Sequence, residues 1–167
     1  ANKIISEHGY PDVITFTNSF AHIENFQELL SAVNLLMSEH TILIIENHYL
    51  GKVLSTGQFD TFYHEHVRTY SAKSFDYIAK SLSAYICKYS FPKRYGGNIR
   101  VFISKTKYNE KLKLVNEEST LEDFSKLSNF IDKWKTNKSI EIESFVKRSK
   151  KPMLGIAFPG SCLLYTS

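Results

Sequence analysis

Two short apolar runs with an amphipathic segment between them limit the fold of this chain more than any other feature. Residues 12–17 and 41–45 are rich in β-branched and apolar side chains, as buried strands are. Strands that are apolar on both faces and joined by a helix are typical of neighbouring parallel strands with a right-handed crossover. The pattern therefore predicts an α/β fold. Residues 24–39 supply the helix, with apolar side chains at helical spacing: Phe26, Leu29, Leu30, Val33, Leu36 and Met37.

The middle of the chain predicts a second helix followed by a hairpin. Residues 71–82 form the helix, and residues 85–91 and 99–103 are typical of strands. Gly96 and Gly97 lie in the connection between these strands, which we expect to pair antiparallel. The sheet is thus predicted to be mixed, mostly parallel, with a C-terminal antiparallel hairpin. The inward face of the helix is expected to carry Phe75, Ile78, Ala79 and Leu82.

The last third of the chain predicts a long helix and the start of a second α/β domain. A charged linker precedes a capping-box pattern at residues 119–122, which opens a helix with a polar break near residue 137. Residues 152–158 then resemble a new strand, and we assign no function to residues 161–167. The side chains expected to face inward from the long helix are Leu121, Phe124, Leu127, Ile131 and Trp134.

Length and composition exclude several classes of protein. A chain of 167 residues with 43% hydrophobic side chains is sufficient for a folded domain with its own core. Its net charge of +4 is mild, and residues 133–151 mix lysines with acidic residues, which indicates a solvated helix face and no nucleic-acid partner. The two cysteines offer no disulfide framework, and no apolar run is long enough to span a membrane. We therefore expect a cytoplasmic protein without a membrane partner, and the start without methionine inside a helix-like segment predicts a fragment.

A cluster of ionisable side chains at Tyr63, His64, Glu65 and His66 is the strongest candidate for a chemical site. Histidine changes charge near neutral pH, and a carboxylate beside it can fix its tautomer. A phenol can donate a hydrogen bond to a developing oxyanion. The cluster therefore contains the groups needed to remove a proton next to a carbonyl. A second interpretation stays open, in which the two imidazoles lie on the surface at the end of a strand.

Polar residues follow the first two predicted strands directly, at residues 18–22 and 46–49. The carboxyl ends of parallel strands meet at one edge of a sheet, where α/β proteins bind their ligands. His22 and His48 belong to these two groups and are the plausible extra ligands if the His-x-His pair at residues 64–66 binds a metal. Because neither a cysteine pair nor a second His-x-His completes such a site, we predict no metal in this chain.

Five short motifs follow one another along the chain. They are NSFAH at 18–22, ENHYL at 46–50, FDTFYHEH at 59–66, YS at 70–71 and GGNIR at 96–100. In this order and spacing they resemble the sugar C-methyltransferases, which use S-adenosylmethionine (SAM) to methylate nucleotide-linked 4-keto deoxysugars. The resemblance covers roughly residues 1 to 160.

The resemblance implies a fold and a division into domains. Residues 1–106 would be the second half of a Rossmann-like class I methyltransferase domain, and residues 107–167 a linker helix and the truncated start of a C-terminal domain. A zinc-binding domain and the glycine-rich loop that grips SAM would precede residue 1. The chain contains no Gly-x-Gly-x-Gly, so its cofactor-binding residues are not identified and the fragment is expected to be inactive alone.

The resemblance also implies a role for each site residue. The C4 ketone of a nucleotide-sugar substrate acidifies the C3 hydrogen, His66 removes it, and C3 of the enolate attacks the methyl group of SAM. Tyr63 and Glu65 would contact the sugar or stabilise the enolate. The substrate-binding residues would be Asn18, His22, Tyr49, Gly96, Gly97 and Arg100.

Three positions depart from the pattern of that family. His48 stands where proline is frequent and is interpreted as a surface residue, Tyr95 replaces a common histidine, and Asn98 replaces a serine. Because of these changes, the identity of the sugar is not determined. Two alternatives also stay open: another small carbonyl substrate, or a non-catalytic scaffold domain. In a regular strand Glu65 and His66 would point to opposite faces, so the mechanism also predicts an irregular turn over residues 63–66.

Overall fold

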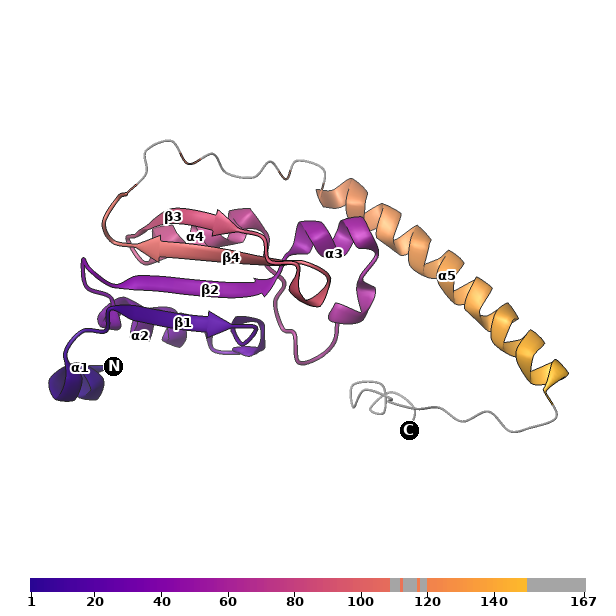
Figure 1. The fold of residues 1–167 in the computed structure, drawn as a ribbon, viewed down its shortest axis with the longest axis horizontal. Coiled ribbons are helices and arrows are strands. Elements are labelled where there is room, and N and C mark those ends of the chain that lie inside the picture. Colours follow the sequence, from indigo (N-terminus) through magenta and orange to yellow (C-terminus); the bar gives the residue numbers. More distant parts are fainter. Residues whose placement is uncertain (109–111, 113–116, 118–119, 150–167) are drawn as a thin grey trace.

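One mixed sheet forms the centre of the molecule (Figure 1). A computed structural model describes residues 1–108, 112, 117 and 120–149. Within them the strands are β1 (Val13–Thr17), β2 (Ile42–His48), β3 (Tyr85–Ser90) and β4 (Asn98–Ser104), in the order β1-β2-β4-β3. The predicted parallel pair of β1 and β2 and the predicted antiparallel hairpin of β3 and β4 are both confirmed. Since β4 also runs antiparallel to β2, the other three strands share one direction, and the α/β class is confirmed.

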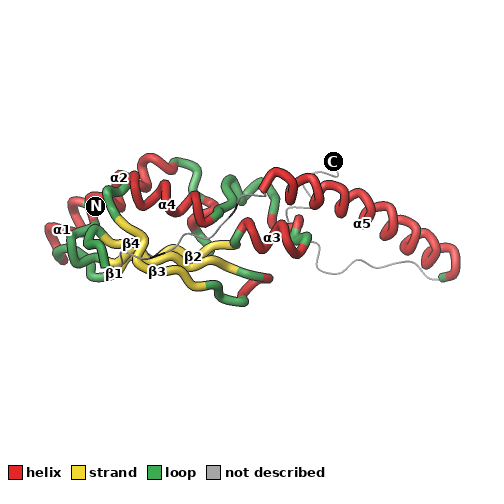
Figure 2. Tube along the Cα trace, turned by 90° about the horizontal axis from the view of Figure 1, so that it is seen from above, coloured by secondary structure: helices red, strands yellow, loops and turns green. Residues whose placement is uncertain are grey.

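Helices α2 and α4 cover one face of this sheet (Figure 2). Leu30 and Val33 of α2, with Phe75 and Ile78 of α4, are buried together with alternate residues of β2 and β4. Both helices lie where the sequence predicts them. The helical elements are α1 (Asn2–His8), η1 (Phe20–His22), α2 (Phe26–Leu36), α3 (Leu50–Thr56), η2 (Phe59–Thr61), α4 (Ala72–Ser81), η3 (Arg94–Gly96) and α5 (Thr120–Arg148).

The prediction that the first strand is buried is wrong. Within the described residues β1 lies at the edge of the sheet, and Val13, Thr15 and Thr17 are exposed. The error has a physical cause. An apolar sequence indicates that a strand can be buried, but its position in the sheet depends on which other strands pair with it.

The long C-terminal helix differs from its prediction in two respects. Helix α5 runs without interruption from Thr120 to Arg148, so the expected break near residue 137 is wrong. Of the side chains expected to face inward, Leu127 is buried, whereas Leu121 is 86% exposed. The helix leaves the body of the protein after its first turns, and the remaining apolar side chains therefore stay largely in solvent (Figure 1).

Two predictions concern parts of the chain that are not described. The expected strand at 152–158 and the residues 161–167 lie outside the described ranges. The division into domains near residue 106 stays a prediction.

Among the helices of the described residues, none has both the length and the apolar character that a membrane span requires.

The ends of several elements converge beyond the carboxyl ends of β1 and β2. Helix α3 ends at Gly57, whose left-handed φ of 67° is a common helix end for glycine. The chain then passes through η2 and a turn at residues 63–66 before Ser71 caps α4. This connection brings residues 58–66 back over the edge of the sheet, where the predicted polar clusters lie.

Candidate functional site

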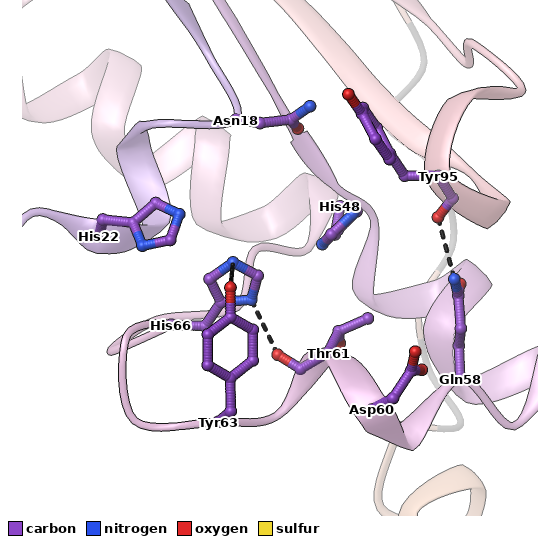
Figure 3. Close-up of a pocket in the computed structure, with 9 residues that line it drawn as sticks. All are labelled: Asn18, His22, His48, Gln58, Asp60, Thr61, Tyr63, His66 and Tyr95. Atoms are coloured by element: carbon purple, nitrogen blue, oxygen red, sulfur yellow. Dashed lines mark hydrogen bonds between the residues drawn. The ribbon is translucent and has the colours of Figure 1, made fainter. Parts of the chain in front are cut away.

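A cavity of about 360 Å³ opens at this edge of the sheet (Figure 3). Its volume falls within the range of small-molecule sites in proteins. Asn18 comes from the end of β1, His22 from η1 and His48 from the end of β2. The other walls come from the segment around η2 and from the turn of η3. The complete lining is Asn18, His22, His48, Gln58, Asp60, Thr61, Tyr63, His66 and Tyr95.

The segment 63–66 forms a turn, as the mechanism requires. The backbone N–H of His66 donates to the carbonyl of Tyr63 over 2.9 Å, and the segment contains no strand residue. This turn points Tyr63 and His66 into the cavity, whereas His64 and Glu65 are exposed. The interpretation of both imidazoles as surface residues at a strand end is therefore wrong for His66.

The hydrogen bonds of His66 fix the tautomer of its ring. Nδ1 lies 2.8 Å from the carbonyl oxygen of Thr61, which can only accept, so Nδ1 carries the hydrogen. In the neutral ring, Nε2 then bears a lone pair, and the hydroxyl of Tyr63 lies 3.2 Å from it. When the Tyr63 hydroxyl turns away from Nε2, the lone pair of a neutral imidazole here can accept a proton from a ligand.

Three imidazoles share the cavity. The ring centroid of His66 lies 4.7 Å from that of His22 and 5.6 Å from that of His48. Burial lowers the pKa of His48, and the neighbouring rings of His66 and His22 lower it further, against a smaller opposing effect of Asp60. His48 is therefore held neutral in the folded protein. No group of three or more histidine, cysteine or acidic side chains within the described residues has an arrangement that could hold a metal ion.

Two lining residues have strained backbones. Asn18 has φ 52° and Tyr95 φ 50°, in the left-handed region that side chains other than glycine rarely adopt. The side-chain amide of Gln58 donates to the carbonyl of Tyr95 over 3.0 Å and so supports that turn. Such strain costs about 1–3 kcal/mol per residue and is frequent at binding sites.

A buried carboxylate lies in strand β2, two residues before the lining residue His48. Glu46 of β2 is 1% exposed and accepts hydrogen bonds from Asn98 over 2.9 Å and from Arg100 over 2.7 Å. Burial by itself would raise the pKa of Glu46. The hydrogen bonds from Asn98 and Arg100, together with the charges of Arg100 and Arg94, outweigh burial and hold the pKa below its ordinary value. Glu46 is therefore a carboxylate at neutral pH.

The structure brings four of the residues predicted for the site into the cavity: Asn18, His22, Tyr63 and His66. Glu65 lies outside its lining, and its Oε1 lies 3.9 Å from Nε2 of His64.

The other predicted ligand contacts also lie outside the lining. Tyr49 packs against Phe91, and burial together with the charge of Glu117 raises its pKa to about 12. Gly96 and Gly97 face the side chains of Gln58 and Lys52, and Arg100 is paired with Glu46.

Several lining residues were not predicted. His48 was interpreted as a surface residue, but it lines the cavity as the last residue of β2. The available signal was its position beside the polar group after the second strand. Asp60 and Thr61 belong to the motif at residues 59–66, which was the available signal for them, whereas Gln58 and Tyr95 meet through a hydrogen bond between residues 37 positions apart.

Comparison with known proteins yields one informative similarity. No protein-family model matches the chain. The chain is 30% identical over 100 residues to the C-methyltransferase NovU of Streptomyces niveus, a match that covers 60% of this chain. The match spans 24% of NovU, so the chain corresponds to about a quarter of that protein. The chain is therefore similar to part of a C-methyltransferase.

Proposed function

We propose that this chain is part of a SAM-dependent C-methyltransferase that deprotonates a carbon next to a carbonyl and methylates it. The observation that carries the proposal is the ring of His66, which lines the cavity with Nδ1 donating to the Thr61 carbonyl and Nε2 beside the Tyr63 hydroxyl. The similarity to a C-methyltransferase supports the reaction class. The order of the five motifs supports a nucleotide-linked 4-keto deoxysugar as substrate, with C3 as the reacting carbon.

The residues that line this cavity do not form a SAM site by themselves. None of the lining residues is a glycine, and Gly96 and Gly97, beside the lining residue Tyr95, are packed against Gln58 and Lys52. No backbone stretch of the cavity is thus open to the close approach that a glycine-rich loop allows. The mechanism therefore concerns proton transfer, which the described residues can perform.

In the proposed step, the hydroxyl of Tyr63 turns from Nε2 of His66 to the oxygen of the ketone, and the freed Nε2 takes the hydrogen on the carbon beside that ketone. The C–H bond breaks, its electron pair forms the enolate, and the proton converts His66 to an imidazolium. Its Nδ1–H remains bound to the Thr61 carbonyl, so the ring keeps its orientation throughout. Burial and the charge of Glu65 raise the pKa of Tyr63, so its phenol stays protonated and can donate to an oxyanion.

The test uses the complete gene product that contains this chain. Wild-type protein is incubated in deuterated water with SAM and thymidine diphosphate 4-keto-6-deoxyglucose, and the C3 proton is followed by NMR. We expect exchange and methylation in wild type, and a rate lower by about 10²–10⁴-fold in His66→Gln, as removal of a general base does.

His40→Gln is the matched control, because His40 is exposed at the opposite end of β2. Full activity of His66→Gln would refute the role of His66. Exchange and methylation with other small ketones only would refute the sugar substrate and leave the reaction class. No binding of SAM by the complete protein would favour a non-catalytic scaffold.

A further inference from the structure

A chain of polar side chains leads from the interior of the sheet to the cavity. Nδ2 of Asn98 donates to Oε1 of Glu46 over 2.9 Å and to Oδ1 of Asn18 over 3.1 Å. Glu46 and Asn98 are each 1% exposed, whereas Asn18 lines the cavity. The three residues come from β2, β4 and the end of β1, so the chain of hydrogen bonds crosses three strands of the sheet.

The carboxylate determines the direction of every hydrogen bond in this chain. An ionised carboxylate can only accept, so Asn98 must turn its amide nitrogen toward Glu46. The second hydrogen of that nitrogen is donated to Asn18, so the side-chain oxygen of Asn18 must accept it. The amide nitrogen of Asn18 is left for the cavity, and the described residues contribute no hydrogen bond from it to another group of the protein.

Two further contacts hold this arrangement in place. Nε and Nη2 of Arg100 lie 2.7 and 2.6 Å from Oε2 of Glu46, so the other carboxylate oxygen is occupied and the charge is paired. The backbone N–H of Asn18 donates to the carbonyl of Glu46 over 2.8 Å, which ties its left-handed backbone to β2. Both the backbone and the side chain of Asn18 are therefore set by Glu46.

We propose that Asn18 donates its side-chain N–H to the carbonyl oxygen of the ligand, and that Glu46 is the positioning residue that directs this donor through Asn98. The ligand is then a ketone that presents its oxygen to Asn18 and its acidic C–H to His66, residues that lie on different walls of the cavity (Figure 3). A preorganised donor strengthens its bond as the ketone becomes an enolate, and so accelerates deprotonation. The ligand part of this proposal rests on the proposed function.

A purely structural role of Glu46 is the competing explanation, because its pair with Arg100 also joins β2 to β4. The two explanations differ in what they predict for Asn18. Asn18→Asp keeps the shape and the acceptor oxygen toward Asn98, but it replaces the donor by a second oxygen. Glu46→Gln keeps the shape as well, but an amide can donate or accept, so the orientation of Asn98 and Asn18 is no longer fixed.

The first arm of the test uses the complete protein without ligand. The side-chain amide resonances of Asn18 and Asn98 are assigned by ¹⁵N NMR and compared between wild type and Glu46→Gln. We expect both resonances to move, because the change passes from Glu46 through Asn98 to Asn18. An Asn18 resonance that stays unchanged while that of Asn98 moves would overturn the positioning role, whether or not the ligand is correctly identified.

The second arm uses thymidine diphosphate 4-keto-6-deoxyglucose labelled with ¹³C at the ketone, bound to the His66→Gln protein so that it does not react. We expect the infrared C=O band of the bound ketone to shift to lower frequency than in water-free solvent, and the shift to disappear in His66→Gln/Asn18→Asp. With His66 present, Asn18→Asp should lower kcat for C3 exchange about 10²–10³-fold, with a smaller change in KM, as loss of one oxyanion donor does.

Asn34→Asp is the matched control, since it makes the same chemical change on an exposed position of α2. An unshifted C=O band in the bound complex, or a normal kcat in Asn18→Asp, would overturn the donor role. Failure of the wild-type protein to bind or exchange this sugar would instead refute the proposed substrate, while the ligand-free arm still decides the role of Glu46.

Discussion

At the scale of single residues, the three imidazoles of the cavity differ in what surrounds them. His66 is fixed by the Thr61 carbonyl on one side and by the Tyr63 hydroxyl on the other. His48 lies between the ring of His66 and that of Tyr95, with centroid distances of 5.6 and 6.0 Å. Burial and the two neighbouring imidazoles lower the pKa of His48. At neutral pH its ring is therefore an uncharged part of the cavity lining.

The lowered pKa of His48 predicts a pH dependence of stability. In the unfolded chain a histidine takes up a proton below about pH 6.5, whereas folded His48 resists protonation until a lower pH. The unfolded state therefore binds more protons in this window, and the free energy of unfolding falls as the pH drops from about 6.5 toward the folded pKa. Groups facing His48 are His66, His22, Tyr95 and Asp60, of which Asp60 opposes the shift.

Urea unfolding of wild type and His48→Gln at pH 7.5 and 5.5 measures this effect. We expect the loss of stability between the two pH values to be smaller in His48→Gln than in wild type. His40→Gln, an exposed position, should behave as wild type. Equal losses in wild type and His48→Gln would mean that His48 is protonated as easily in the folded protein as in the unfolded chain.

At the scale of elements, the site depends on where helices begin and end. Helix α4 is capped by Ser71, whose hydroxyl accepts from the backbone N–H of Ser74 while the hydroxyl of Ser74 accepts from that of Ser71. The carboxylate of Glu117 accepts two more bonds at this helix start, from the N–H groups of Ala72 and Lys73. Tyr70, directly before the cap, donates its hydroxyl to the carbonyl of Phe20 beside η1. The start of α4 thus ties the segment after the turn at residues 63–66 to the element that carries His22.

Removal of this cap should destabilise the protein measurably. Ser71→Ala is expected to lower the free energy of unfolding by about 1 kcal/mol, as loss of an N-cap side chain typically does. Ser55→Ala, which removes an exposed hydroxyl from α3, should stay within about 0.5 kcal/mol of wild type. Denaturant titration of the three proteins checks the prediction, and equal midpoints for Ser71→Ala and wild type would show that Glu117 caps α4 sufficiently alone.

At the scale of the whole molecule, α5 supports the segment that forms one side of the cavity. Leu127 is buried beside the end of α3, which leads into this segment, and Phe130 packs so closely on Gly57 that an added Cβ would lie 2.8 Å from its ring. The ring of Trp134 contacts that of Phe59 at a centroid distance of 5.1 Å. Since Phe59 begins η2, which also carries Asp60 and Thr61, the orientation of His66 depends on a helix that begins more than fifty residues later.

This dependence can be measured with the single tryptophan of the chain. Leu127→Ala should weaken the contact of α5 with η2, shift the emission of Trp134 to longer wavelength, and slow C3 proton exchange by the complete protein. Leu121→Ala is the control, because Leu121 is 86% exposed on the same helix. In a complete protein with further tryptophans, these are replaced by phenylalanine first. Unchanged emission and exchange in Leu127→Ala would show that α5 does not support the site.

The sequence determined the local elements, because apolar periodicity is a property of neighbouring residues. The strands, the helices α2 and α4, the parallel pair and the hairpin were all predicted from such patterns, as was the gathering of Asn18 and His22 at one edge of the sheet. The turn at residues 63–66 was predicted from the roles that the family resemblance implies for Glu65 and His66, since these side chains would point to opposite faces of a regular strand.

Only the tertiary structure decided which polar residues face the cavity. The turn sends Tyr63 and His66 inward and Glu65 outward, a choice that depends on backbone angles and not on residue type. The pairing of Glu46 with Asn98 and Asn18 likewise joins residues up to 80 positions apart. Periodicity carries no information across such distances, so the direction of the Asn18 donor became visible only once the strands were placed side by side.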